Sequence, residues 1–230
     1  MLNMGGPADT SDVHNFLLRL FSDEDIIKLP FQSILSRIIA SRRAPKVEAQ
    51  YSLIGGGSPI HHWTATQGKA MVDILDQISP GSGTLTFFTL ITAPHKFYVG
   101  FRYAHPLVEE AINQIESDGI ERAVAFSQYP QYSCVTSGSS YNAIAKHYND
   151  PRKYGLAGID NIPAPGRKPG PLWSFLDRWP TNTHLVDAIV MHLKSEVDQL
   201  EKTHHTRDAV VLFSAHSIPM EVAKRGDPYP

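Results

Sequence analysis

A histidine directly follows a β-type run late in the sequence. Residues Val210–Phe213 predict a buried strand, and the small residues Ser214 and Ala215 leave the imidazole of His216 accessible at its carboxyl end. Imidazole titrates near neutrality, so it can accept a proton or hold a metal. A serine hydrolase is disfavoured because the sequence has no G-x-S-x-G turn. We therefore interpret His216 as a catalytic candidate, the alternative being a histidine that satisfies a loop carbonyl.

A basic cluster precedes a glycine turn. Arg42 and Arg43 lie three to four residues before Lys46, and the segment GGGSP follows at residues 55–59. Their charges, the turn's N–H groups and Ser58 could bind a carboxylate or a phosphate. A solvated basic face and a plain flexible turn are the alternatives, because GGGSP lacks the lysine and spacing of a P-loop.

Cysteine and histidine usage argues against two common kinds of site. The single cysteine, Cys134, excludes an internal disulfide framework and favours a reducing compartment. The pairs His61–His62 and His204–His205 have no cysteine or carboxylate at metal-ligand spacing, so we expect most histidines to be surface residues.

Composition predicts a folded chain without a bulk preference for nucleic acid. The 230 residues are 42% hydrophobic and 19% charged, with a formal net charge of -2, which suits one large α/β domain or two modest ones. No stretch approaches the ~18 to 20 apolar residues that span a bilayer. The start, MLNMGG, reads as the last residues of a buried strand, so we expect upstream sequence to be missing.

The elements that must position these residues alternate along the chain. Helices are expected from Asp12, which is placed to cap the first of them, after Pro30, from Trp63 to Ile78, at 105–119, at 139–149, and from Thr183 to Glu201. Strands are expected at 96–103, 122–128 and 209–215, and a further strand is possible within 172–179. Such alternation predicts a parallel sheet covered on both faces, with ligands beyond its carboxyl ends. Arg102, Tyr103, His216 and the loop at 128–134 should then face one cleft.

Several segments, taken in order, resemble the ferrochelatase family in its mitochondrial eukaryotic form. They are LNMGGP, RRAPK, QYSLIGGGSPI, GFRYAHP, QYPQYSC, DRWPT and LFSAHSIPMEVAKRGDPYP. The resemblance covers nearly the whole chain except 81–92 and 154–171. It implies an α/β chelatase fold of two Rossmann-like domains with parallel sheets: a first domain at 1–180, with inserts near those two segments, and the start of a second at 181–230.

The resemblance also implies an activity and its site. The family inserts Fe²⁺ into protoporphyrin IX, with His216 as proton acceptor, metal ligand or both, and with Arg102 and Tyr103 beside the macrocycle. The residues expected to bind the porphyrin are Met4, Leu20, Phe21, Arg42, Arg43, Lys46, Tyr51, Ser58 and Tyr129. An apolar lip that also includes Leu17, Pro30 and Phe31 implies monotopic attachment to the matrix side of the inner mitochondrial membrane. A homodimer is possible, and no nucleic-acid partner is implied.

Cys134 matches the first of four cysteines that hold a [2Fe–2S] cluster in many eukaryotic members. Because this chain has one cysteine, no such cluster is expected to form from it alone. The chain also stops before the family's acidic active-site residues, so we expect it to be inactive and poorly folded by itself. A chelatase for another metal or porphyrin, and a non-catalytic porphyrin-binding protein, remain competing hypotheses.

Two further departures concern single segments. Residues 81–92 are either a lineage insertion or translated intervening sequence, and we favour the latter because an exposed apolar β run is an aggregation hazard. Asn182 stands where many animal members have a histidine, which puts an iron-donor role there in doubt.

Overall fold

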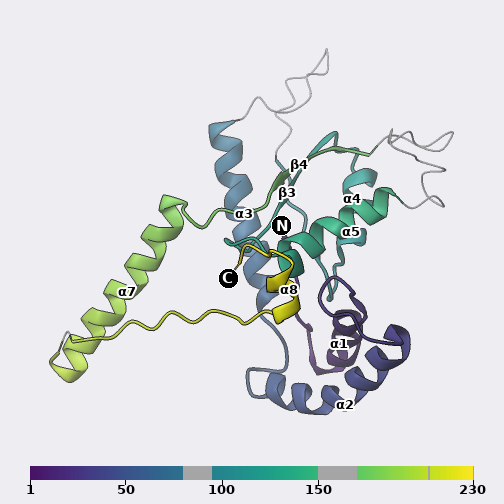
Figure 1. Ribbon diagram of the computed structural model, residues 1–230. Coiled ribbons are helices and arrows are strands. Elements are labelled where there is room, and N and C mark those ends of the chain that lie inside the picture. Colours follow the sequence, from purple (N-terminus) through teal and green to yellow (C-terminus); the bar gives the residue numbers. More distant parts are fainter. Residues whose placement is uncertain (80–94, 150–169, 207, 230) are drawn as a thin grey trace, which may run out of the picture.

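The computed structural model describes residues 1–79, 95–149, 170–206 and 208–229 (Figure 1). The predicted insert at 81–92 and nearly all of that at 154–171 lie outside the described residues. The described part is α/β, as the sequence predicts.

Short parallel strands form the centre of the fold. Strand β1 (Leu2–Asn3) pairs with β2 (Gly100–Phe101), and β3 (Arg122–Phe126) pairs with β4 (Leu172–Leu176). A parallel bridge between Leu2 and Ser127 joins the two pairs. The parallel arrangement and the possible strand at 172–179 are confirmed, while the strand predicted at 96–103 is only two residues long.

The N-terminal helices build the first core. After a 3₁₀ turn at Thr10–Asp12 come α1 (Val13–Ser22), α2 (Gln32–Ser52) and α3 (Ile60–Ile78). The apolar face of α1 packs against α2 and the β2 region, with Val13, Phe16, Leu17, Ala40, Ala44, Phe101 and Tyr103 buried together. This is the amphipathic stripe that the sequence predicts.

The predicted cap of the first helix is wrong. Asp12 already has helical dihedral angles, φ -80 and ψ -14, and its side chain makes no capping hydrogen bond. The extended residue Asp9 takes the role instead, because its carboxylate accepts from the Ser11 amide at 2.7 Å. The 3₁₀ turn thus moves the cap three residues upstream.

A second core lies between the strands and two later helices. Helix α4 (Val108–Ser117) and helix α5 (Ser139–Tyr148), which a π turn at Cys134–Gly138 precedes, enclose Leu2, Val108, Ile112, Ala125, Ala143 and Ile144. The opposite face of β3–β4 stays open, with Val124 63% and Leu172 68% exposed. The prediction that the sheet is covered on both faces is therefore wrong for this strand pair within the described residues.

Helix α7 and the extended run after it stand away from both cores. Helix α7 (Thr183–His204) has no buried residue, and an extended run leads back from it to the short helix α8 (Met220–Lys224) (Figure 1). The strand predicted at 209–215 is absent, and Val210 and Phe213 are 87% and 86% exposed. A β-type run needs neighbouring strands to pair with, and none of the described strands runs beside it. The domain boundary at residue 180 stays a prediction.

Candidate active site

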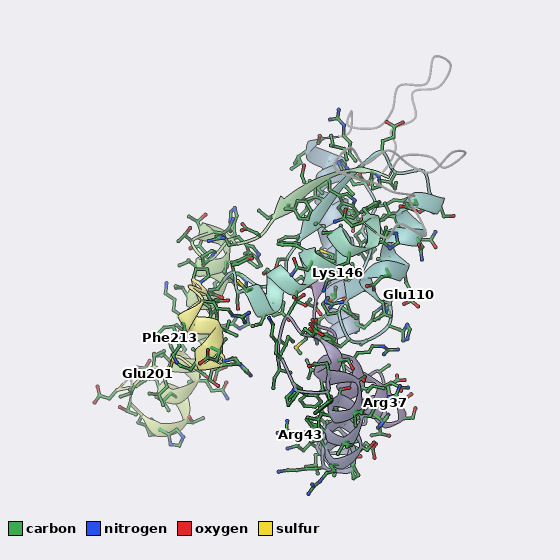
Figure 2. All side chains as sticks on the ribbon, turned by 45° about the vertical axis from the view of Figure 1, so that its right-hand side comes forward. Arg37, Arg43, Glu110, Lys146, Glu201 and Phe213 are labelled. Atoms are coloured by element: carbon green, nitrogen blue, oxygen red, sulfur yellow. The ribbon has the colours of Figure 1, made fainter. Side chains whose placement is uncertain are left out.

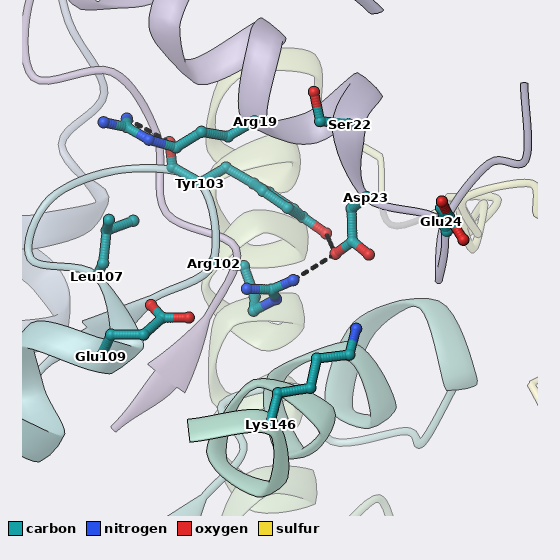
Figure 3. A pocket seen from close by; sticks show the side chains of 9 residues that line it. All are labelled: Arg19, Ser22, Asp23, Glu24, Arg102, Tyr103, Leu107, Glu109 and Lys146. Atoms are coloured by element: carbon teal, nitrogen blue, oxygen red, sulfur yellow. Dashed lines mark hydrogen bonds and ion pairs between the residues drawn. The ribbon is translucent and has the colours of Figure 1, made fainter. Parts of the chain in front are cut away.

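A cavity of about 570 Å³ opens where α1 ends and β2 gives way to a loop (Figure 3). It is lined by Arg19, Ser22, Asp23, Glu24, Arg102, Tyr103, Leu107, Glu109 and Lys146. The lining mixes cations and carboxylates, and Arg19, Asp23 and Arg102 among them already have hydrogen-bond partners.

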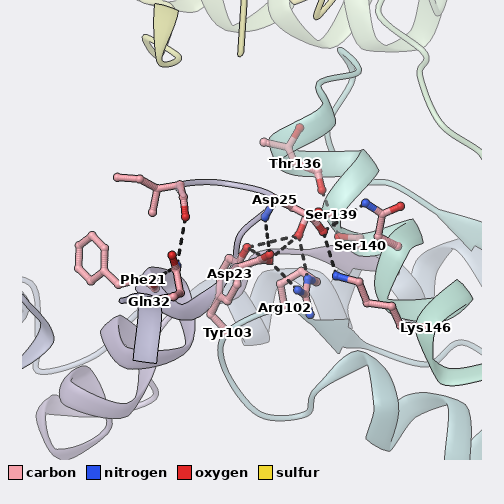
Figure 4. A network of polar contacts seen from close by, with 12 residues as sticks. Phe21, Asp23, Asp25, Gln32, Arg102, Tyr103, Thr136, Ser139, Ser140 and Lys146 are labelled. Carbon is pink, nitrogen blue, oxygen red and sulfur yellow. Dashed lines mark hydrogen bonds and ion pairs between the residues drawn. The ribbon is translucent and has the colours of Figure 1, made fainter. Parts of the chain in front are cut away.

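Asp23 is the centre of the polar network at this cavity (Figure 4). Its Oδ2 accepts from Arg102 Nη2 at 2.6 Å, from the Tyr103 hydroxyl at 2.7 Å and from Ser139 Oγ at 2.8 Å. Its Oδ1 accepts from the Asp25 amide at 3.0 Å. Four donors therefore hold one buried carboxylate, and Arg102 and Tyr103 are fixed against it.

The surroundings set the charge of this network. Burial disfavours the ionised Asp23, but hydrogen bonds from Tyr103 and the Asp25 amide, with the Arg102 charge, outweigh it and lower the pKa of Asp23. Burial, together with the neighbouring Asp23 carboxylate, raises the pKa of Tyr103 above its ordinary value. At neutral pH the site thus holds a carboxylate, a guanidinium and a neutral phenol.

The structure brings three of the expected site residues together at the strand ends. The Met4 amide donates to the Tyr129 hydroxyl at 3.1 Å, and the Tyr103 amide donates to the Met4 carbonyl at 3.1 Å. Burial raises the pKa of Tyr129. Met4, Tyr129 and Tyr103 therefore meet at one edge of the sheet, and Arg102 precedes Tyr103 in the same loop.

His216 does not reach this edge in the structure. It is exposed, lies in the extended run before α8, and is not among the residues that line the 570 Å³ cavity. The structure therefore does not bring His216 together with Arg102 and Tyr103, and their shared cleft stays a prediction. It depended on a strand at 209–215, which has no partner among the described strands.

The basic cluster is open to solvent on α2. Arg42, Arg43 and Lys46 are exposed, and the Arg43 guanidinium lies 5.5 Å from the centre of the Phe21 ring (Figure 2 labels Arg43). The half-buried Tyr51 packs against the first core, and burial raises its pKa. The carboxylate-binding role of this cluster stays a prediction.

The glycine turn is held by the backbone. The Ser58 amide donates to the Pro7 carbonyl at 2.8 Å, and Ser58 Oγ accepts from the Ile60 amide at 3.3 Å. A Cβ at Gly57 would lie 2.0 Å from the Ala8 carbonyl oxygen, so only glycine fits this approach. Ser58 therefore helps to start α3, and its hydroxyl hydrogen remains available to an acceptor.

The predicted apolar lip divides into buried and exposed parts. Leu17 is 5% exposed and belongs to the first core, so its assignment to the lip is wrong. Leu20 and Phe21 are partly buried against the same core, whereas Phe31 is 80% exposed. No described helix combines the length and apolar character that crossing a membrane requires.

Cys134 is exposed at the start of the π turn. The described residues include no group of three or more His, Cys, Asp or Glu side chains arranged to hold a metal ion. A [2Fe–2S] cluster takes four ligands, whereas this sequence has one cysteine, so the residues present do not fit the cluster by themselves.

Sequence reasoning missed two carboxylates and one cap. Asp23 follows a helix in the run SDED, which is typical of a solvated helix end, and Asp227 lies in a segment typical of a turn. The sequence therefore does not indicate that either carboxylate is buried. Asn182 caps α7, with Oδ1 accepting from the amides of His184 and Leu185 at 3.0 and 3.3 Å. This capping role gives Asn182 a local structural function.

Comparison with known proteins identifies the family. The family model described as Ferrochelatase matches residues 1–230. Mitochondrial ferrochelatases from Gallus gallus and Homo sapiens are each 53% identical over 230 and 232 residues, and that from Schizosaccharomyces pombe is 42% identical over 230. All of this chain is covered, against 51%, 48% and 48% of those proteins, so the chain spans about half their length. The chain belongs to the ferrochelatase family.

Proposed function

We propose that this chain contributes to an enzyme that inserts Fe²⁺ into protoporphyrin IX, the last step of haem formation, in mitochondria. The match of the Ferrochelatase family model to residues 1–230 carries the proposal. The relatives' names, which include the word mitochondrial, support the location. Attachment to the matrix side of the inner membrane, a homodimer and two Rossmann-like domains divided near residue 180 belong to the same proposal.

The reaction requires a base as well as a binding site. Fe²⁺ replaces the two N–H protons of the macrocycle, so the protein must accept protons near the ring centre. His216 is the proposed acceptor or metal ligand, because imidazole titrates near neutrality. In the structure it is exposed, so the extended run must be brought to the sheet edge before it can act.

The sheet edge supplies the proposed porphyrin surface. Met4 and Tyr129 offer an apolar face joined by one hydrogen bond of 3.1 Å, and Arg102 and Tyr103 are fixed beside them by Asp23. Arg42, Arg43 and Lys46 are exposed cations that can meet the two propionates. Leu20, Phe21, Tyr51 and Ser58 complete the proposed binding surface. Cys134 is the one proposed cluster ligand in this chain.

One observation favours a second candidate, a porphyrin-binding protein without insertase activity. His216 is exposed and is not among the residues that line the described cavity. Binding and turnover separate the two functions, because a binding protein would show spectral shifts of protoporphyrin IX without loss of its N–H protons.

The test uses the chain and a fusion. The fusion joins it to the portion of the Gallus gallus relative that this chain does not match. We expect the fusion to convert protoporphyrin IX and Fe²⁺ to haem, followed by absorbance. The His216→Ala fusion should still bind porphyrin but lose turnover by roughly 10²-fold or more. Tight binding by a folded fusion without turnover would favour the binding protein, and His216→Ala turnover equal to that of the parent would contradict the role of His216.

A further inference from the structure

Asp227 makes the polar contacts that tie the C-terminal segment to the π turn. Its Oδ2 accepts from Ser133 Oγ at 2.9 Å and from the Cys134 amide at 2.7 Å, while Oδ1 accepts from the Tyr229 amide at 3.0 Å. Asp227 is 7% and Ser133 is 1% exposed. Buried, charge-assisted hydrogen bonds of this kind are among the strong ones in proteins. They join positions that are 93 and 94 residues apart in sequence.

The segment on one side of this contact is otherwise open. Residues 209–217 are all exposed, and the chain regains burial at Val222 in α8, which is 2% exposed. Figure 1 shows this extended run returning from the far end of α7 to α8 beside the body of the molecule. Val222 and Asp227 are thus the two buried anchors of the described segment 208–229, and His216 lies upstream of both.

On the other side, Ser133 organises the turn that carries the thiol. Its Oγ accepts from the Val135 amide at 3.3 Å and its carbonyl accepts from the Gly138 amide at 3.0 Å, so it caps the π turn that begins at Cys134. Burial and the neighbouring Asp227 carboxylate raise the pKa of the Cys134 thiol. One carboxylate therefore holds the cap and the first amide of the turn that carries the thiol.

We propose that Asp227 is a positioning residue that couples the turn bearing Cys134 to the segment bearing His216, so that a change at the thiol alters how that segment is held. A group added to the Cys134 sulfur adds bulk to the residue whose amide the Asp227 carboxylate holds at 2.7 Å. Loss of the contact would leave Val222 as the remaining buried anchor of residues 208–229. The coupling rests on the contacts above, and only its consequence for metal insertion rests on the proposed function.

The first experiment measures how firmly the segment is held in the 230-residue chain. We expect Asp227→Ala to speed hydrogen exchange of the Cys134 amide and tryptic cleavage after Lys224 and Arg225 by roughly tenfold or more, because buried charge-assisted bonds are lost. Asp208→Ala removes an exposed carboxylate from the same segment and serves as the matched control. Equal rates in Asp227→Ala and the parent would overturn the proposal.

The second experiment tests the coupling from the thiol side in the unaltered chain. Cys134 is the one cysteine, so N-ethylmaleimide labels it without ambiguity. We expect labelling to raise the tryptic cleavage rate at Arg225 in the parent and to have no further effect in Asp227→Ala. Unchanged cleavage after labelling of the parent, or an equal rise in Asp227→Ala, would overturn the coupling.

Ser133→Ala is a second variant that keeps the proposal testable if Asp227→Ala does not fold. It removes one donor to Asp227 and keeps the carboxylate, so we expect a smaller rise in cleavage, with the far-UV spectrum unchanged. Parental rates in a folded Ser133→Ala, together with no effect of labelling, would contradict the proposal even if Asp227→Ala were unfolded. These measurements need no porphyrin or iron, so failure of the proposed function would leave them unaffected.

Discussion

At the scale of single residues, Asp23 determines what Arg102 and Tyr103 can do. The guanidinium is 2.6 Å from its carboxylate and the phenol is 2.7 Å away, so both are held before any ligand arrives. Preorganised groups of this kind can meet a substrate without reorganising. In the cavity of Figure 3, Asp23 thus holds both Arg102 and Tyr103 in place.

Removing the Asp23 carboxylate should destabilise the fold strongly. Asp23→Ala leaves the partly buried Arg102 and the buried Tyr103 hydroxyl without their carboxylate acceptor, and breaking such a pair costs about 3–5 kcal/mol. Asp25→Ala is the control, since its partner Lys146 is 69% exposed and such surface pairs contribute about 0–1 kcal/mol. Urea unfolding of the three proteins checks the difference. A loss under 1 kcal/mol for Asp23→Ala would contradict the network's structural role.

The same residue predicts a pH dependence. The pKa of Asp23 is lower in the folded chain than its ordinary value of about 3.9. Its contribution to stability is therefore fully present above about pH 4 to 5 and is lost as pH falls through the folded value. We expect the difference in melting temperature between the parent and Asp23→Asn to be constant near neutrality and to shrink below about pH 4. A difference that grows on acidification would contradict this sign.

The sequence predicts the residues at strand ends better than their partners. Arg102, Tyr103 and Tyr129 lie at the ends of β-type runs, and parallel strands bring such positions to one edge. In the structure the Tyr103 amide donates to the Met4 carbonyl, and the Met4 amide donates to the Tyr129 hydroxyl. Asp23 meets Tyr103 across 80 positions and Asp227 meets Ser133 across 94. Such contacts follow from packing, which no local pattern specifies.

At the scale of elements, helices were predictable and isolated strands were not. The 3.6-residue periodicity of Val13, Phe16 and Leu17 locates α1, because one buried face suffices for a helix. The run at 209–215 has a strong β propensity, but a strand forms only when it pairs with a neighbouring strand. The strand predicted at 209–215 is therefore absent because no described strand pairs with it, although its sequence favours a strand.

Helix α7 depends on its cap because none of its residues is buried. Asn182→Ala removes the acceptor for the amides of His184 and Leu185, which typically costs about 1 kcal/mol. We expect faster hydrogen exchange across the first turn of α7. Asn15→Ala, an exposed position inside α1, is the control and should be neutral or stabilising. Equal protection of α7 in parent and Asn182→Ala would refute the capping role.

Phe31 combines a strained backbone with an exposed side chain, and the effects of the two can be measured separately. It has a left-handed backbone, φ 52 and ψ 49, directly before α2, and its side chain is 80% exposed. Glycine relieves about 1–2 kcal/mol of strain there and loses part of this to chain entropy. We expect Phe31→Gly to stabilise the chain by up to about 1 kcal/mol. The proposed membrane attachment further predicts that this variant binds anionic lipid vesicles more weakly than the parent.

The control for Phe31 is a neighbouring apolar position with ordinary helical geometry. Ile34 is 59% exposed inside α2, so Ile34→Gly should destabilise the chain by a few tenths of a kcal/mol to about 1. Thermal unfolding and vesicle sedimentation measure the two effects separately. Destabilisation by both glycine variants would contradict strain at Phe31.

At the scale of the whole molecule, the described cores are complete only on their N-terminal side. Side chains from α1, α4 and the strands form the two buried clusters. By contrast, α7, the run at 209–215 and one face of β3–β4 expose large apolar side chains. Figure 2 shows Phe213 on the C-terminal part, away from the body that carries Lys146. In the run at 209–215 the exposed side chains are consecutive, from Val210 to Phe213, and exposed apolar surface of this kind marks a binding or association surface.

That surface makes a prediction about the segment bearing His216. In the 230-residue chain the amides of residues 209–215 should exchange rapidly, because the structure pairs them with no described strand. In the fusion to the unmatched portion of the Gallus gallus relative, pairing should protect them by at least tenfold, and haem formation should appear only there. Leu212→Asp, at a side chain that is 88% exposed in the chain alone, should leave its unfolding free energy within about 0.5 kcal/mol but abolish protection in the fusion. The exposed Asp208→Ala change is the control and should alter neither. Rapid exchange of 209–215 in a fusion that forms haem would contradict the idea that pairing of this run positions His216.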